Sequence, residues 1–295
     1  MAFDRCFSAA EYFELVGSPV LGPRWALEHY LASQHRSNEP FGVAGVCDLC
    51  ARPVLFAVDF ANTWTAPDGV VVPNWRESMT CPECRLNGRQ RMIASLVRST
   101  CADLATRVDR NQPRVVYIAE QATPFYRWCM SQVPLGECIS LIGSEYFDDD
   151  SVRPNGMDDI RHEDAERLSL GDASIDLYVS CDVLEHVNDP SAVLREVARV
   201  VRPGGRVLLT FPLDPHKQLT TRRARKTGRV VEHFLPPTHH LDPCRADGAL
   251  VYHDFGWDVL EEMRSAGVRD AALFVYWSDV SGYLGIQFYF AGTRS

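Results

Sequence analysis

The sequence predicts an α/β protein that combines a mostly parallel β-sheet with a small metal-binding module. From Arg114 onward, short apolar runs alternate with helical stretches, a pattern typical of a parallel sheet covered on both faces. Before that region, two CxxC motifs begin at Cys47 and Cys81 and indicate a metal site. The length of 295 residues fits one large domain and a smaller one.

The charge balance argues against a nucleic-acid-binding protein. The chain has 30 Lys and Arg residues against 39 Asp and Glu residues, a formal net charge of −9, whereas sequence-independent nucleic-acid binding depends on cationic side chains that neutralise phosphates. No run approaches the ~20 apolar residues of a membrane span, and the first residues lack a basic stretch followed by an apolar core. We therefore expect a cytoplasmic protein without a membrane partner.

Residues 1–40 are predicted to form a helical segment, and residues 41–91 a metal-binding module. Helical spacing of apolar residues covers 9–16 and 25–33, and Gly17 and the Gly22-Pro23 pair separate the two stretches. In the module, 54–58 is predicted to be a strand and 67–69, Pro-Asp-Gly, a turn. A helix over 89–108 then leads into the larger domain, predicted to span 92–295.

The two CxxC motifs favour a structural zinc site. Four thiolates at ~2.3 Å satisfy a tetrahedral zinc ion, and each CxxC turn supplies two of them. Two unrelated thiol pairs are one alternative, and a redox motif is another, although redox CxxC motifs occur singly at a helix N-terminus. Because a shell of four thiolates has no open position, we assign the ion to folding. The predicted ligands are Cys47, Cys50, Cys81 and Cys84.

Strand and helix signals in the larger domain follow one another in a regular order. Apolar residues recur at helical offsets over 191–201, which gives that helix one apolar face. No helix separates the last two strands, so we expect them to pair antiparallel. The predicted strands are 114–119, 138–143, 159–162, 175–180, 206–211, 272–277 and 286–291. The predicted helices are 124–132, 191–201 and 257–266.

Several motifs in the second half of the domain resemble those of class I S-adenosylmethionine-dependent methyltransferases of the type 11 sort. They are the segment DAERL at 164–168, the strand and LEHV run within 176–187, and the RPGG turn at 202–205. The resemblance covers roughly residues 113–292. It implies a Rossmann-like seven-stranded methyltransferase sheet with an antiparallel last pair, and S-adenosylmethionine bound at the carboxyl ends of the parallel strands.

The resemblance also implies roles for individual residues. Glu145, just after the second strand, takes the place of the acid that accepts hydrogen bonds from the ribose hydroxyls. Asp164 and Ala165 match the pair beside the adenine, and Cys181 and Asp182 match positions near the methionine and its reactive methyl group.

The loop after the first strand departs from the family pattern. The family has a glycine-rich loop there, whereas residues 119–124 read Ala-Glu-Gln-Ala-Thr-Pro. Glu120, facing the cofactor's ammonium group, and Gln121 are the polar candidates that the loop offers to the cofactor. Non-glycine side chains occupy space at such a loop, so a second hypothesis stays open. In it, the protein has a remodelled cofactor site and serves as a binding or scaffold module, or catalyses another reaction.

A polar insertion over 212–253 is predicted to form the substrate side. Its segment 216–229 has six Lys or Arg residues and no acid, so it is either a solvated loop or a site for a phosphate or carboxylate group. His239 and His240 are the preferred general-base candidates, ahead of His253, and His186 of the LEHV run borders the active site in the resembled family. Each could instead be structural. The combined prediction is a biosynthetic methyltransferase acting on a small, optionally anionic, molecule.

Overall fold

The computed structural model describes residues 6–7, 22–35, 39–106, 113–133, 138–148, 154 and 156–295. The predicted helix over 9–16 lies outside these residues. The chain divides into two compact units. Unit 1 contains Met1–Ser99 and Leu273–Phe288, and unit 2 contains Thr100–Ala272 and Tyr289–Ser295. No helix in the described part of the chain is both long and apolar enough to cross a membrane.

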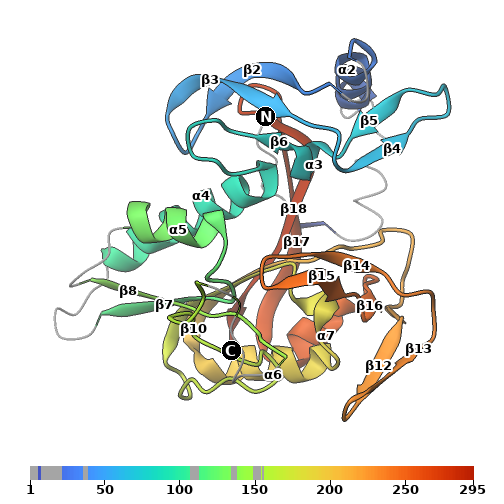
Figure 1. Cartoon of the computed structure of the whole chain (residues 1–295). Coiled ribbons are helices and arrows are strands. Elements are labelled where there is room, and N and C mark those ends of the chain that lie inside the picture. The colour runs from blue at the N-terminus through green and yellow to red at the C-terminus, as the bar shows by residue number, and fades with distance from the viewer. Residues whose placement is uncertain are drawn as a thin grey trace. The chain divides into compact units, whose positions relative to one another are not determined.

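Unit 1 is built mainly from short antiparallel strands (Figure 1). Strands β2, β3 and β6 form one sheet, and β4 pairs with β5 across the predicted turn, where Gly69 has a φ of 86°. The predicted strand 54–58 lies within β3, and the predicted helix 25–33 lies within α2. The elements are α2 (Gly22–Ser33), β2 (Phe41–Cys47), β3 (Arg52–Val58), β4 (Thr63–Thr65), β5 (Val71–Pro73), α3 (Trp75–Ser78) and β6 (Met79–Thr80). Helix α4 (Gly88–Ala105) begins in unit 1 and ends in unit 2.

A mixed seven-stranded sheet confirms the α/β fold class. Its strand order is β1-β17-β18-β10-β9-β7-β8. The pairs β7–β8, β7–β9 and β9–β10 are parallel, whereas β18 runs antiparallel to β10. The last two strands are hydrogen-bonded neighbours, as predicted. The bounds are β1 (Cys6–Phe7), β7 (Arg114–Ile118), β8 (Ile139–Gly143), β9 (Ile175–Cys181), β10 (Val201–Thr210), β17 (Val268–Ser278) and β18 (Tyr283–Arg294).

The predicted third strand, 159–162, is wrong. Only a single bridge between Glu145 and His162 forms there. Ile160 is the one apolar residue of this segment, so a strand would gain little from burial. The seventh strand of the sheet is instead the short β1, which pairs with β17.

Helices α5 and α6 of unit 2 each start at a side-chain cap. Helix α5 (Pro124–Gln132) matches the predicted range, because the Thr123 hydroxyl accepts the Tyr126 N–H and Pro124 fits the first turn. Helix α6 (Pro190–Val200) is capped by Asp189 and buries the predicted apolar face. Helices α5 and α6 lie on opposite sides of strands β7 and β8 (Figure 1). The remaining helices are η1 (Leu184–His186) and α7 (Val259–Ser265).

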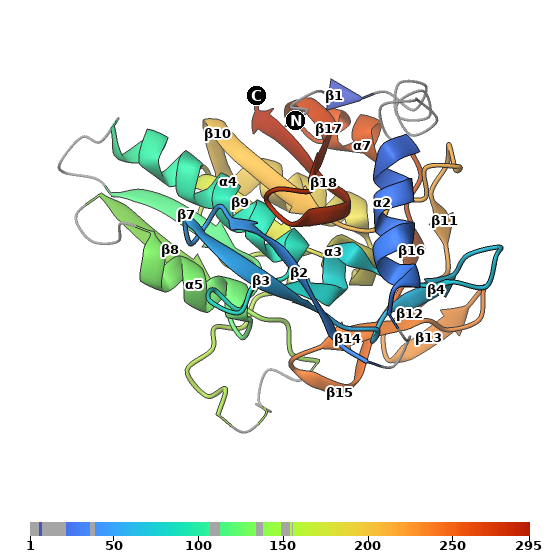
Figure 2. The same ribbon diagram turned by 90° about the horizontal axis from the view of Figure 1, so that it is seen from above.

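The predicted insertion consists of short paired strands (Figure 2). Strands β12 and β13 form one hairpin, β14 and β15 form a second, and β11 pairs with β16. These strands are β11 (Thr221–Arg222), β12 (Ala224–Thr227), β13 (Val230–His233), β14 (His239–Asp242), β15 (Arg245–Leu250) and β16 (His253–Asp254).

Asp176 in β9 is the acceptor at the centre of a buried hydrogen-bond network in unit 2. Its carboxylate, in a residue 5% exposed, accepts hydrogen bonds from Arg202 at 2.7 Å, from the Val115 N–H at 2.8 Å and from Arg114 at 3.1 Å. We expect Asp176→Ala to lower the free energy of unfolding by about 3 kcal/mol, because a buried backbone donor and two arginines lose their acceptor.

Urea denaturation of the full chain measures this loss. The matched control is Asp172→Ala, since the Asp172 side chain is 80% exposed and pairs only at the surface with Arg199. That change should cost less than about 1 kcal/mol. Equal effects of the two substitutions would contradict a structural role for Asp176.

Candidate functional site

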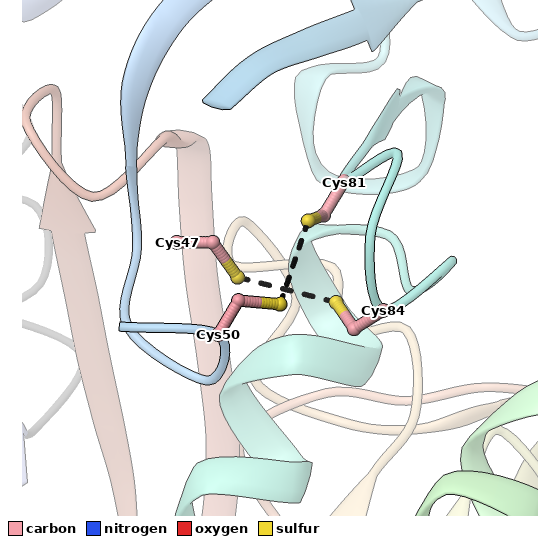
Figure 3. Close-up of side chains that lie close together, drawn as sticks. All are labelled: Cys47, Cys50, Cys81 and Cys84. Carbon is pink, nitrogen blue, oxygen red and sulfur yellow. Dashed lines mark hydrogen bonds between the residues drawn. The ribbon is translucent and has the colours of Figure 1, made fainter. Parts of the chain in front are cut away.

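Four cysteine side chains of unit 1 converge on one point (Figure 3). The sulfurs of Cys47 and Cys84 lie 4.0 Å apart, and those of Cys50 and Cys81 lie 3.9 Å apart. Sulfurs at the corners of a tetrahedron around zinc, at ~2.3 Å from the ion, are about 3.8 Å apart. The spacing therefore fits one zinc ion, and these are the four ligands that the sequence predicts.

The backbone of the two CxxC turns is built alike. The residue after each second cysteine, Ala51 or Arg85, has a positive φ of 52° or 63°. Non-glycine residues avoid this region at a cost of about 1 kcal/mol, and a metal that fixes both turns offsets that cost. A hydrogen bond from Cys84, with one from the Cys50 N–H, lowers the pKa of Cys47 to about 4 against the effect of burial. The site thus favours a thiolate.

In unit 2, Glu145 follows β8 and holds the loop that lacks glycine. Its Oε1 accepts hydrogen bonds from the backbone N–H groups of Gln121 at 2.8 Å and Ala122 at 2.7 Å. Burial raises the pKa of Glu145, and these two hydrogen bonds oppose the rise. Among the described residues, positive φ angles at non-glycine positions occur only outside this loop. The loop therefore follows its path with ordinary L-residue geometry.

The side chains of Glu120 and Gln121, the polar candidates in that loop, interact with other residues of the protein. Glu120 is 8% exposed and lies near enough to Cys129 of α5 to raise the pKa of its thiol, in addition to the larger effect of burial. The Gln121 side-chain oxygen accepts the Arg161 N–H at 3.1 Å. A cavity of about 360 Å³ lies between this loop and α5 and includes Gln121 and Tyr126 in its lining.

Of the other predicted cofactor residues, Cys181 and Asp182 stand at a strand end, whereas Asp164 and Ala165 lie in the segment between β8 and β9, where the predicted third strand does not form. Asp164 is exposed, and its Oδ1 accepts the Glu166 N–H at 2.9 Å, while Ala165 is half-buried. Cys181 ends β9, and Asp182 follows it with a φ of 53°, a conformation that Asp tolerates better than most residues. The Asp182 carboxylate accepts the Thr210 hydroxyl at 2.9 Å and ties the ends of β9 and β10 together.

The β14–β15 hairpin lies over the Glu145 carboxylate, a contact that the sequence did not predict. Cys244 and Glu145 are within hydrogen-bonding range. Burial raises the pKa of the Cys244 thiol, and the negative charge of Glu145 raises it further. Arg245 donates to Asp148 at 3.0 Å and lies over the Tyr146 ring at 5.4 Å. Cys244 is 99 residues from Glu145, so no local signal marks it.

The structure separates the candidate histidines. His186 and His240 lie together, with Nδ1 of His240 at 3.2 Å from Nε2 of His186, whereas His239 is exposed. Interaction with the Glu185 carboxylate, against the effect of burial, raises the pKa of His240. Burial is the main reason that the pKa of His253 falls to about 4. Glu185 was not predicted as a site residue, although its place beside His186 in the LEHV run could have suggested it.

Three of the six cations of segment 216–229 form polar contacts within the protein. Arg222 donates to the Asn188 carbonyl at 2.6 Å, and Arg223 donates to Asp254 at 2.8 Å. Lys217 also lies 3.4 Å from Asp254. These contacts favour a structural role for the three side chains over an anion site.

A family model described as a methyltransferase domain matches residues 138–209. This segment, about a quarter of the chain, is similar to the methyltransferase domain family. The match runs from β8 to the end of β10 and includes Glu145, Asp164, Cys181, Asp182 and His186.

Two curated relatives are similar over a limited part of the chain. The malonyl-[acyl-carrier protein] O-methyltransferase of Hahella chejuensis is 31% identical, over 36% of this chain and 42% of its own length. The 27-O-demethylrifamycin SV methyltransferase of Amycolatopsis mediterranei is 30% identical, over 38% and 45%. The chain thus spans less than half the length of each. A solved S-adenosylmethionine-dependent methyltransferase from Mesorhizobium loti matches 66% of this chain and 96% of its own, with 18% identity and a TM-score of 0.37.

Proposed function

We propose that this protein is an S-adenosylmethionine-dependent methyltransferase that acts on a small-molecule acceptor. The observation that carries the proposal is the placement of Glu145 shortly after β8 and of Asp182 directly after β9, at the carboxyl ends of two parallel strands that flank β7, within a matched methyltransferase segment. Ligands of open α/β sheets bind at the carboxyl ends of the parallel strands. The relatives and the family therefore agree with the chemistry that these side chains offer.

The Glu145 carboxylate fits a double role. Both loop N–H groups bind its Oε1, and a carboxylate has about four acceptor positions in total. Oε1 can thus fix the loop while Oε2 accepts a ribose hydroxyl in exchange for the Cys244 thiol. Asp164 and Ala165 would lie beside the adenine, and Cys181 and Asp182 near the methionine portion. The backbone of the loop, rather than the Glu120 side chain, would border the cofactor.

When bound, S-adenosylmethionine would supply the methyl group of its sulfonium to a lone pair of the acceptor. The protein's part is to hold the acceptor in line and to exclude water. Glu185, His186 and His240, which follow β9 or fold back toward it, stand where the acceptor would approach. Arg222, Arg223 and Lys217 are paired within the protein, so an anionic acceptor would have to be bound by the other cations of the segment.

Calorimetric titration with S-adenosylhomocysteine tests the proposal. We expect micromolar binding by the full chain, weakened at least tenfold in Glu145→Gln, because the amide keeps one acceptor oxygen for the loop but loses the charge and the second acceptor. The control is Glu261→Ala, whose side chain is 74% exposed on α7 and should leave binding unchanged.

Absence of binding by the intact, zinc-loaded chain would instead support a second function. In that case the contact between Cys244 and Glu145 keeps the cofactor out, and the domain serves as a binding module or catalyses a different reaction. Binding that is unaffected by Glu145→Gln would contradict the assignment of the ribose acid.

A further inference from the structure

Glu185 is a buried carboxylate with an incomplete environment. The residue is 1% exposed, and within the part of the chain that the structure describes neither of its oxygens has a hydrogen-bond partner at ordinary distance. Two imidazole nitrogens lie near its Oε1, Nδ1 of His240 at 3.5 Å and Nε2 of His186 at 3.6 Å. Burying a carboxylate without a compensating partner is costly. A cation bound beside Glu185 would offset that cost.

The three side-chain atoms form a nearly equilateral triangle. Its sides are 3.5 Å and 3.6 Å from Glu185 Oε1 to the two imidazoles, and 3.2 Å between the imidazole nitrogens. Nitrogen and oxygen ligands of a tetrahedral metal ion, with bonds of about 2.0–2.2 Å, are about 3.3–3.6 Å apart. The triangle therefore has the dimensions of one face of a metal coordination shell.

The orientation of His186 suits a ligand. Its Nδ1 lies 2.8 Å from the Leu250 carbonyl oxygen. A carbonyl can only accept a hydrogen bond, so Nδ1 carries the proton, and Nε2 directs its lone pair toward Glu185 and His240. Metal-binding histidines are commonly fixed in this way by a backbone carbonyl on the other ring nitrogen.

A cation among these three atoms would offer each of them a partner at once. Bound there, it would also lie near the negative charge of Asp182.

We propose that Glu185, His186 and His240 bind one divalent transition-metal ion. Two imidazoles and one carboxylate are ligands that suit Zn²⁺, Fe²⁺, Co²⁺ and related ions, and three protein ligands leave at least one coordination position open. This ion is separate from the thiolate-bound ion of unit 1, whose four-sulfur shell is closed. Metal binding itself is independent of the proposed methyltransferase function. A further step, in which the open position takes an oxygen or nitrogen of the acceptor, rests on that function.

Cobalt titration of the full chain, with zinc already bound to the four cysteines, tests the site. We expect one Co²⁺ per chain to bind with visible d–d absorption and without the sulfur-to-cobalt charge-transfer bands of thiolate ligands. His240→Ala and Glu185→Gln should each weaken this binding at least 100-fold. The matched control is His239→Ala, which removes the exposed neighbouring imidazole on the same strand and should leave the affinity unchanged.

Metal analysis after zinc dialysis provides the second measurement. We expect two zinc ions per chain in the wild type and in His239→Ala, and one in His240→Ala. A wild-type chain that holds only the thiolate-bound ion would overturn the proposal, as would a second ion that persists in both His240→Ala and Glu185→Gln. Titration with S-adenosylhomocysteine separates the two proposals, because failure of cofactor binding does not affect the cobalt spectrum.

Discussion

Replacing Cys81 by Ser is expected to abolish zinc binding at the four-cysteine site and to unfold unit 1. Structural zinc contributes an apparent ~10–16 kcal/mol in zinc-finger peptides, which exceeds the ~5–15 kcal/mol total stability of a typical domain. A zinc ion there would join the turn after β2 to the turn after β6, next to Ala51 and Arg85 with their positive φ angles. Without one thiolate, the other three sulfurs no longer complete a tetrahedron.

Metal analysis and thermal unfolding measure this effect. The variant should lose one zinc ion per chain, and its first unfolding transition should move below ambient temperature. Cys101→Ala serves as the control, because Cys101 is a fully buried cysteine of α4 outside the metal site. It should keep the metal and lose about 1 kcal/mol. A folded, zinc-free Cys81→Ser protein would contradict the structural role of the ion.

Replacing Arg91 by Met is expected to destabilise unit 1 by about 3 kcal/mol. Arg91 is fully buried, and its guanidinium lies 4.4 Å from the centroids of both the Phe56 and Tyr283 rings. It donates hydrogen bonds to the carbonyls of Ser281, at 2.8 Å, and Gly282. Methionine fills part of the volume but leaves both carbonyls without their donor.

The comparison with Arg91→Lys separates charge from geometry. Lysine keeps the charge but lacks the planar fork that stacks on two rings and reaches two carbonyls, so about half of the loss should remain. Arg52→Met is the surface control, since the pair of Arg52 with Glu83 is more than half exposed on the arginine side and contributes little. Urea denaturation measures all three variants. Equal stability of wild type and Arg91→Met would refute the assigned role.

Elements that depend on neighbouring residues were predictable. Helix α5 matches the predicted 124–132 because Thr123 and Pro124 fix its start locally. The cysteine ligands follow from the CxxC spacing, since each turn places two sulfurs by itself. The strand predicted at 159–162 was wrong because a strand at a sheet edge needs a partner strand and apolar contacts, and the spacing of residues in the sequence carries no information on either.

The site residues, too, divide into those that local sequence predicts and those that depend on contacts between distant segments. Glu145 and Asp182 could be placed at strand ends because the alternation of strands and helices defines those ends. The contacts of Cys244 with Glu145 and of His240 with Glu185 join residues 99 and 55 positions apart, and depend on how the β14–β15 hairpin folds back. The sequence marks Arg91 only as a residue of a predicted helix, whereas in the structure the distant turn at Ser281 covers its guanidinium.

The sequence by itself determined the α/β class, the four-cysteine site and the strands that precede Glu145 and Asp182, because periodicity and spacing are local properties of the chain. Only the tertiary structure decided that His240 rather than His239 joins His186, and that Glu185 completes the cluster. It also decided that Leu273–Phe288 belongs with the N-terminal unit. These outcomes depend on contacts between distant segments, whose geometry is set by packing and by the burial of charge rather than by any local pattern.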